Sequence, residues 1–206
     1  MNEDELKNGV SICLSNAESL ISDAELLKNN GRKERAYALF QLASEEIGKA
    51  SQVLNFLLLK DINDASAYKL FLKQFLDHKA KTNSFISFDY FVLMALKEQI
   101  VDKKKFLEAT IYEFNNLKLL NDLKNYSLYT SIIDDKFVSP KQLITNEHLN
   151  RIEFRINTRY KLAKFMLETA TKMSHEIREF QLNTPIDEEQ LRVKTVDEIV
   201  ELLSSN

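Results

Sequence analysis

The chain has 206 residues, of which 44% are hydrophobic, and a formal net charge of −3 at pH 7. This content allows a packed core and excludes wholesale disorder, while the charge excludes bulk attraction to nucleic acid, so RNA binding would need a local basic patch. Only 3 Gly and 2 Pro are present, which leaves few turns for a many-stranded sheet. The composition therefore predicts an all-α protein.

Cysteine content and hydropathy restrict the class of protein further. The single cysteine, Cys13, excludes an intramolecular disulfide and a cysteine-based zinc site. No apolar run approaches the roughly 18 residues of a membrane-spanning helix, and the acidic segment Asn2–Glu5 is unlike a signal peptide. We therefore expect a soluble, cytoplasmic protein with no membrane partner.

Two long helices are predicted at the start of the chain. Apolar residues recur at helical spacing over residues 4–29 and again from Arg35 to Leu59. Asn30-Gly31 is a helix stop between them, so we expect a long antiparallel hairpin. The apolar stripe of the second helix consists of Ala36, Leu39, Phe40, Ala43, Ile47, Ala50 and Leu54.

Charged residues lie beside that stripe, and a glycine interrupts them. At 100° per residue, Glu46 falls at the edge of the stripe, and Glu45 precedes Lys49 by the i,i+4 step that favours an ion pair. Gly48 costs about 1 kcal/mol relative to alanine in mid-helix, so we expect a close neighbour there. This pattern is typical of a core helix with a salt-bridged flank, and it is also compatible with one wall of a functional site.

The middle of the chain predicts two further helical regions and an irregular insert. A third helix begins near Ala65 and ends within residues 77–82, and a fourth begins near Ser87 or Asp89 and reaches Leu123, with an interruption around residues 102–105. Residues 125–145 favour extended structure with a turn at Asp134-Asp135, which indicates a short hairpin. The inward-facing residues of the third helix are expected to be Tyr68, Phe71, Leu72, Phe75 and Leu76.

The clearest helix begins at Thr145 or Asn146 and keeps its apolar period as far as Phe180. Residues 183–206 are expected to be a peripheral segment with one short helix, opened by the capping box Thr195-x-x-Glu198. We therefore expect one domain over residues 1–182.

Few residues in this chain could carry chemistry. It has 3 His, none within a Glu-x-x-His motif, so a di-metal bundle is not favoured and no metal or cofactor is expected. The remaining chemistry is acid–base catalysis. His78 can exchange protons near neutral pH, and Lys79 or Lys81 can stabilise a phosphate. The alternative for His78 is an ordinary surface histidine.

A basic ridge is formed by Arg151, Arg155 and Arg159 at successive i,i+4 positions. It could follow a phosphate backbone. The alternative is a solvated face neutralised by Glu147 and Glu153.

Three motifs occur in a characteristic order. They are Ala43-x-Glu45-Glu46-Ile47-Gly48-Lys49, then Phe75-x-x-His78-Lys79-x-Lys81, then Lys124-x-x-x-Leu128-Tyr129 followed by Pro140. Over residues 10–180 the chain thereby resembles the AbiV-like abortive-infection family of the HEPN class of helical nuclease-like domains. The resemblance implies a HEPN-like helical bundle and a role in bacterial phage defence. It also implies a homodimer, RNA or the translation machinery as target, and a phage-encoded activator.

This resemblance leads to a set of candidate site residues. If the protein cleaves RNA, His78 is the expected general acid/base, Lys49 and Lys81 hold the phosphate, and Glu46 orients one of these groups. The other expected RNA- or phosphate-binding residues are Lys79, Lys124, Arg155 and Arg159, and the expected structural or orienting residues are Glu45, Arg35 and Tyr129.

The chain departs from one family pattern. Metal-independent HEPN ribonucleases carry Arg, four to six residues and then His, whereas the nearest match here is Lys73-x4-His78. Two hypotheses follow: a metal-independent ribonuclease or translation inhibitor, and a non-catalytic helical interaction module. A four-helix carboxylate metal protein is a third and weaker hypothesis.

Overall fold

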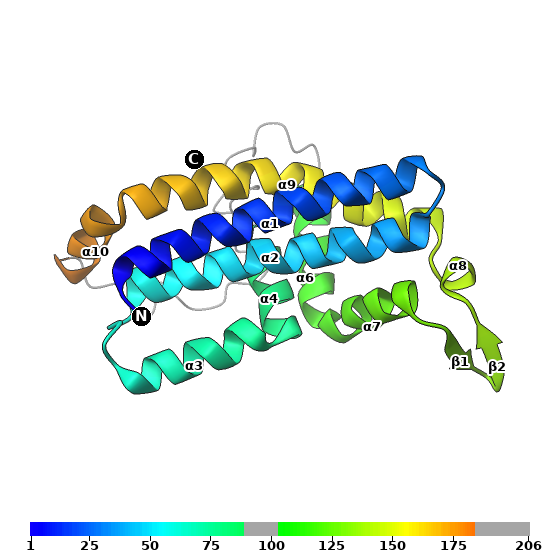
Figure 1. Cartoon of the computed structure of the whole chain (residues 1–206), viewed down its shortest axis with the longest axis horizontal. Coiled ribbons are helices and arrows are strands. Elements are labelled where there is room, and N and C mark those ends of the chain that lie inside the picture. The colour runs from blue at the N-terminus through cyan, green and yellow to red at the C-terminus, as the bar shows by residue number, and fades with distance from the viewer. Residues whose placement is uncertain (89–102, 184–206) are drawn as a thin grey trace.

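The computed structural model describes residues 1–88 and 103–183. Within these ranges the regular structure is helical apart from one two-stranded hairpin, which confirms the all-α prediction (Figure 1). No helix in this part of the chain is long and apolar enough to cross a membrane.

The two longest N-terminal helices, α1 (Glu3–Asn29) and α2 (Lys33–Leu59), lie antiparallel and side by side, as predicted (Figure 1). The turn between them depends on Gly31, whose φ of +72° is strained for any residue with a Cβ. The Arg32 N–H donates to the Leu27 carbonyl at 2.9 Å, and the Gly31 N–H to the Lys28 carbonyl at 2.9 Å. These bonds satisfy the last carbonyls of α1 in a Schellman motif.

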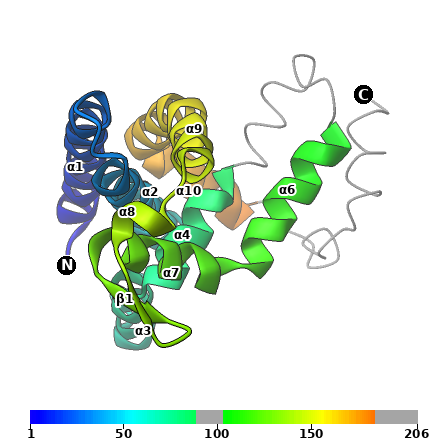
Figure 2. The same cartoon turned by 90° about the vertical axis from the view of Figure 1, so that its right-hand side faces the viewer.

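Helix α2 is the centre of the molecule. It contacts α1, α4 (His78–Ile86), α7 (Leu117–Leu128) and α9 (Asn146–Lys172), and Figure 2 shows these helices around it. The predicted stripe is buried except for the half-buried Leu39, but the opposite side of α2 is buried as well. The expected charged flank at Glu45 therefore lies in the interior, because α4 and α7 cover a face that apolar spacing alone marks as solvent-exposed.

The predicted third helix is two helices. α3 (Ala65–Leu76) ends at Asp77, whose extended backbone breaks the helix and whose carboxylate accepts a hydrogen bond from the Ala80 N–H at 2.8 Å. His78 consequently begins α4 instead of lying at the end of α3. Phe71 is buried as expected, but the prediction was wrong for Leu72 and Leu76, which are exposed because α3 packs through a narrow face.

The next part of the chain contains α6 (Lys103–Asn115), α7, β1 (Ser131–Ile133), β2 (Lys136–Val138) and the short α8 (Pro140–Leu143). Of the two starts expected for the fourth helical region, Ser87 is the C-cap of α4 and Asp89 lies outside the described residues. The region's expected end at Leu123 was wrong, since α7 continues to Leu128 and the irregular insert begins later. The predicted hairpin is confirmed, with positive φ at Asp134 and Asp135 in its two-residue turn.

The last described helices are α9 and α10 (Ser174–Asn183). Thr145 is the N-cap of α9, as predicted, and its hydroxyl accepts a hydrogen bond from the His148 N–H at 3.2 Å. The helix that was expected to continue to Phe180 is interrupted at Met173. The side chains of Met173 and Phe180 are both exposed. The expected C-terminal segment lies almost wholly outside the described residues.

Candidate functional site

The candidate site is built around Glu45, a carboxylate on α2 that is only 3% exposed. Its Oε1 accepts a hydrogen bond from the Lys124 Nζ of α7 at 2.6 Å, and its Oε2 lies 2.6 Å from the His78 Nδ1 of α4. The Lys81 Nζ, also from α4, lies 3.4 Å from the same Oε2. One carboxylate thus joins all three of the motifs found in the sequence.

Gly48 explains how α4 comes so close to α2. A Cβ at this position would lie 2.0 Å from the carbonyl oxygen of Lys81, a distance that no side chain can occupy. The backbone of α4 therefore rests directly on α2 one turn after Glu45. The close neighbour expected at Gly48 is confirmed, and it brings both His78 and Lys81 to Glu45.

The hydrogen bonding of Glu45 determines the proton position on His78. An ionised carboxylate can only accept, so the 2.6 Å contact assigns the proton to Nδ1. The Lys124 Nζ, 3.2 Å from the same Nδ1, is then a second donor that converges on Glu45. The His78 side chain is 56% exposed, which leaves its Nε2 as the ring nitrogen that can exchange a proton with a ligand.

The charges around Glu45 leave a positive surplus. Burial raises the pKa of Glu45, but the hydrogen bonds from Lys124 and His78 outweigh this effect and hold the pKa below its ordinary value of 4.5. Glu45 is therefore ionised at neutral pH. The carboxylate faces two ammonium groups, Lys81 and Lys124, so the cluster is net positive even with a neutral His78, which favours an anion beside it.

Glu46 and Lys49 are placed differently from Glu45. The Lys49 Nζ donates to Glu46 Oε1 at 2.5 Å, so the ion pair on α2 has i,i+3 spacing instead of the expected Glu45–Lys49 spacing. Lys49 also lies over the ring of Phe75, 5.3 Å from its centroid. The ion pair joins Lys49 to Glu46, and the cation–π contact holds the Lys49 ammonium group against Phe75 of α3. His78 takes part in neither contact.

The remaining residues expected near the site have separate roles. The Arg35 guanidinium donates to the Leu128 carbonyl at 3.0 Å and thereby holds the end of α7 against α2. Tyr129, the next residue after Leu128, is the C-cap of α7, and its side chain is exposed. Lys79 is exposed next to His78 on the first turn of α4.

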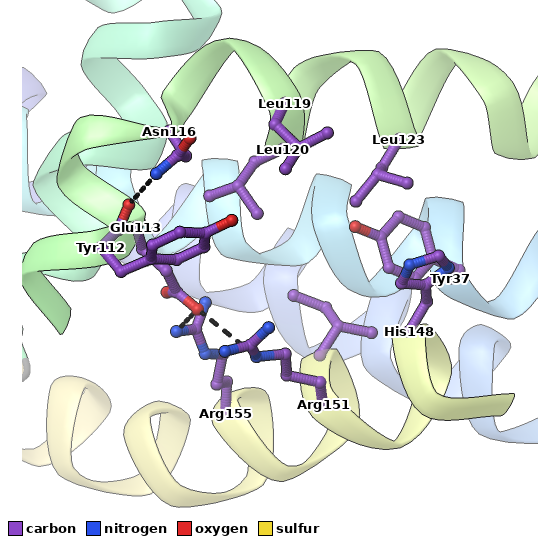
Figure 3. Close-up of a pocket in the computed structure, with 11 residues that line it drawn as sticks. Tyr37, Tyr112, Glu113, Asn116, Leu119, Leu120, Leu123, His148, Arg151 and Arg155 are labelled. Carbon is purple, nitrogen blue, oxygen red and sulfur yellow. Dashed lines mark hydrogen bonds and ion pairs between the residues drawn. The ribbon is translucent and has the colours of Figure 1, made fainter. Parts of the chain in front are cut away.

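The basic ridge on α9 lies beside a buried carboxylate that sequence reasoning missed, and it runs from the exposed Arg151 to the buried Arg159. Glu113 of α6 is 2% exposed and forms an ion pair with Arg155 (Figure 3). Arg151 and Arg159 each lie 3.9 Å from the same carboxylate. Arg159 is buried, and its guanidinium lies 4.8 Å from the ring centroid of Phe85.

The alternative given for this ridge, a solvated face neutralised by nearby acids, is therefore corrected in part. Glu153 does not neutralise it, because its carboxylate accepts two hydrogen bonds from Lys28 at 2.5 and 2.7 Å. Nor is the whole ridge solvated, since Arg159 is buried, while the Arg151 side chain is 56% exposed. Glu113 lies in a segment without a recognisable motif, and its pairing with α9 depends on tertiary packing.

No group of three His, Cys, Asp or Glu side chains that could hold a metal occurs within residues 1–88 and 103–183. The site instead combines one histidine, one carboxylate and two lysines on a helical bundle. Such a bundle, built on a long helix hairpin, is of the HEPN type. The family model for AbiV, a HEPN family, matches residues 5–160, and the chain belongs to this family. No curated protein and no solved structure matched the chain significantly.

Proposed function

We propose that this AbiV-family protein acts in phage defence as a metal-independent endoribonuclease, with His78 as the proton-transferring residue. The observation that supports the proposal is the Glu45–His78 hydrogen bond of 2.6 Å, which orients an otherwise exposed imidazole. A carboxylate that fixes the Nδ1 proton leaves Nε2 as the nitrogen that can accept a proton, on a side chain that is 56% exposed, as in other carboxylate–histidine pairs. We assign Glu45, rather than Glu46, as the orienting carboxylate.

The proposed reaction is an internal transfer at phosphorus. His78 Nε2 accepts the proton of the ribose 2′-hydroxyl, whose oxygen attacks the adjacent phosphorus. The bond from phosphorus to the 5′-oxygen breaks, and this oxygen takes a proton from water. The hydroxide that remains removes the proton from His78 Nε2, which restores the neutral imidazole. The products are a 2′,3′-cyclic phosphate and a 5′-hydroxyl, and no metal or redox cofactor is required.

The lysines would act chiefly through their charge. Lys81 and Lys124 are each 6% exposed, so they stabilise negative charge at the phosphate from below the surface. Such fixed charges act strongly where water is excluded. The exposed Lys79 is the residue that we propose to contact the RNA backbone.

The test is incubation of the purified protein with total RNA in EDTA. We expect cleavage to 2′,3′-cyclic phosphate ends, and a loss of about 100-fold or more in rate for His78→Gln, because general acid–base catalysis contributes about that much. His175→Gln is the matched control, since this histidine is exposed on α10 and should leave the rate unchanged. Absence of cleavage by the parent, with RNA from uninfected and phage-infected cells, would contradict the nuclease proposal.

A second candidate function is a non-catalytic interaction module. The observation that favours it is the burial of Glu45, Lys81 and Lys124, which is also what a purely structural ion network shows. A plaque assay separates the two functions. If His78→Gln protects cells from phage as well as the parent does, while RNA remains intact, the protein acts by binding a partner.

A further inference from the structure

A pocket of about 370 Å³ lies between α2, α3 and α4, three helices that pack against one another (Figure 1). Its volume lies within the range of roughly 300–1,000 Å³ that is usual for ligand pockets. Helix α4 contributes Ala80, Asn83 and Ser84 to the lining. At 100° per residue, Ala80 and Asn83 point about 160° and 140° away from His78. The pocket is therefore separate from the candidate site around Glu45, although α4 contributes to both.

Side-chain amides supply most of the polar groups in this pocket. Gln52 and Asn55 come from α2, Gln74 from α3 and Asn83 from α4, and the hydroxyl of Ser84 lies among them. Asn55, Gln74 and Asn83 are exposed, and their side chains form no hydrogen bond to another described residue. These amides are therefore available to a ligand.

Gln52 is the buried amide of the set, at 8% exposed. Its Nε2 donates a hydrogen bond to the Ser84 Oγ at 3.3 Å, and this hydroxyl donates to the Ala80 carbonyl at 3.0 Å. The Gln52 Oε1 is buried and accepts no hydrogen bond from a described residue. A buried amide oxygen without a donor is unfavourable, and the last torsion of a glutamine side chain is soft. A turn about that bond presents the oxygen to an N–H group of a ligand in the pocket.

The rest of the lining is largely apolar. Phe56 and Phe71 are buried, and their rings stack with centroids 4.7 Å apart. Leu59 and Leu70 line the same pocket and are each 53% exposed. Because the aromatic rings are fixed and the leucines are accessible, this side of the pocket can bury an apolar group of a ligand.

The hydrogen-bonding groups and the charge of the lining define the class of ligand. A primary amide has a carbonyl acceptor and two N–H donors, which complement the N–H and C=O groups of a peptide bond. The charged lining residues are Lys60 and Asp64, one of each sign, so the pocket is neutral at pH 7. A ligand that combines uncharged N–H and C=O groups with an apolar group is a peptide segment.

We propose that this pocket binds an extended peptide segment of a partner protein. The main-chain groups of the segment pair with Gln52, Asn55 and Asn83, and an apolar side chain packs against Leu59 and Leu70. The volume equals that of about twelve waters, so the pocket holds roughly two residues and the segment continues over the surface. Main-chain hydrogen bonds supply affinity in this mode of recognition, and the pocket for a side chain supplies specificity.

The experiment starts from a display library of random seven-residue peptides, selected on the full chain. We expect enrichment of sequences with an apolar residue between uncharged neighbours. The most enriched peptide is then synthesised, and its Kd is measured by calorimetry. A copy with methyl groups on the two main-chain nitrogens nearest the apolar residue lacks these N–H donors. This copy should bind about 10-fold more weakly or worse, because two hydrogen bonds are lost.

Variants of the protein locate the bound peptide. Asn55→Leu/Asn83→Leu keeps the size of two exposed side chains but removes both amides, so the peptide should bind about 10-fold more weakly. Asn150→Leu, at an exposed amide of α9 outside the pocket, is the matched control and should leave the Kd unchanged. Gln52→Leu removes the unpaired oxygen and should weaken peptide binding without lowering the urea midpoint of unfolding.

The outcomes separate this site from the proposed nuclease. His78→Gln should bind the peptide as the parent does, so the two proposals can fail independently. The peptide proposal is overturned if selection enriches no sequence over the bare support, if the methylated copy binds as tightly, or if a correctly folded Asn55→Leu/Asn83→Leu binds unchanged. Displacement of the peptide by hexauridylate would also overturn it, because the pocket would then take RNA.

Discussion

Replacing Glu45 by glutamine should destabilise the fold more than most single substitutions do. The change keeps the size of the side chain but leaves Lys81 and Lys124 as buried ammonium groups without a counter-charge, both only 6% exposed. Removing one partner of a buried ion pair costs about 3–5 kcal/mol, a large part of the roughly 5–15 kcal/mol by which a domain is stable. In urea unfolding followed by circular dichroism, the midpoint should fall by about 2 M for an m-value near 2 kcal/mol/M.

The matched control is Glu46→Gln, at the neighbouring residue. Its ion pair with Lys49 lies closer to the surface, so its loss should cost about 1 kcal/mol or less. The double variant Glu45→Gln/Lys124→Met should recover part of the lost stability, because it also removes one uncompensated charge. If Glu45→Gln unfolds at the same urea concentration as Glu46→Gln, the buried ion network contributes no more to stability than a surface pair, and the reasoning is refuted.

Three other predictions concern the glycine beside α4, the carboxylate of Glu45 and the thiol of Cys13. Gly48→Ala should destabilise the fold by about 2 kcal/mol or more despite the better helix propensity of alanine, because its Cβ would lie 2.0 Å from the Lys81 carbonyl oxygen. The control is Gly9→Ala, whose Cβ would have its nearest contact at 3.5 Å and which should be neutral or stabilising in the same urea assay. Because the pKa of Glu45 is lowered in the folded state, its carboxylate stabilises the fold at pH values above 4.5, and this stabilisation is lost as the pH falls through the folded pKa. The free energy of unfolding, measured against pH, should therefore decline less steeply in acid for Glu45→Gln than for the parent. Burial, with a smaller contribution from the charge of Glu46, raises the pKa of the Cys13 thiol to about 11. A thiol reagent at about pH 8 should therefore label this residue slowly in the folded protein and rapidly in urea, and equal labelling rates would contradict its burial.

Local sequence determined much of the helical framework. The Asn30-Gly31 stop, the Thr145 cap and the Asp134-Asp135 turn depend on backbone preferences of a few neighbouring residues, so they could be identified without tertiary information. The unusual Gly48 likewise indicates a close approach without naming the neighbour. The break at Asp77 is a local signal too, since aspartate is a good N-cap, but the apolar period across it favours a longer helix.

Tertiary packing decided which charged residues meet. Helical spacing places Glu45 beside Lys49 and favours Glu46 as the residue at the edge of the core. In the fold, Glu45 instead binds His78 and Lys124, which are 33 and 79 residues away in sequence. Adjacent residues on a helix differ by 100° in direction, so the choice between the two carboxylates depended on where α4 and α7 pack.

The arginine ridge shows the same division between sequence and structure. Its i,i+4 spacing correctly places Arg151, Arg155 and Arg159 along one side of α9. Spacing within one helix carries no information on the partner across from it, and the nearby Glu147 and Glu153 were the only acids that spacing could offer. Among the described residues a partner is Glu113, from a helix separate in sequence, because the tertiary packing brings this carboxylate to the guanidinium groups of Arg155 and Arg159.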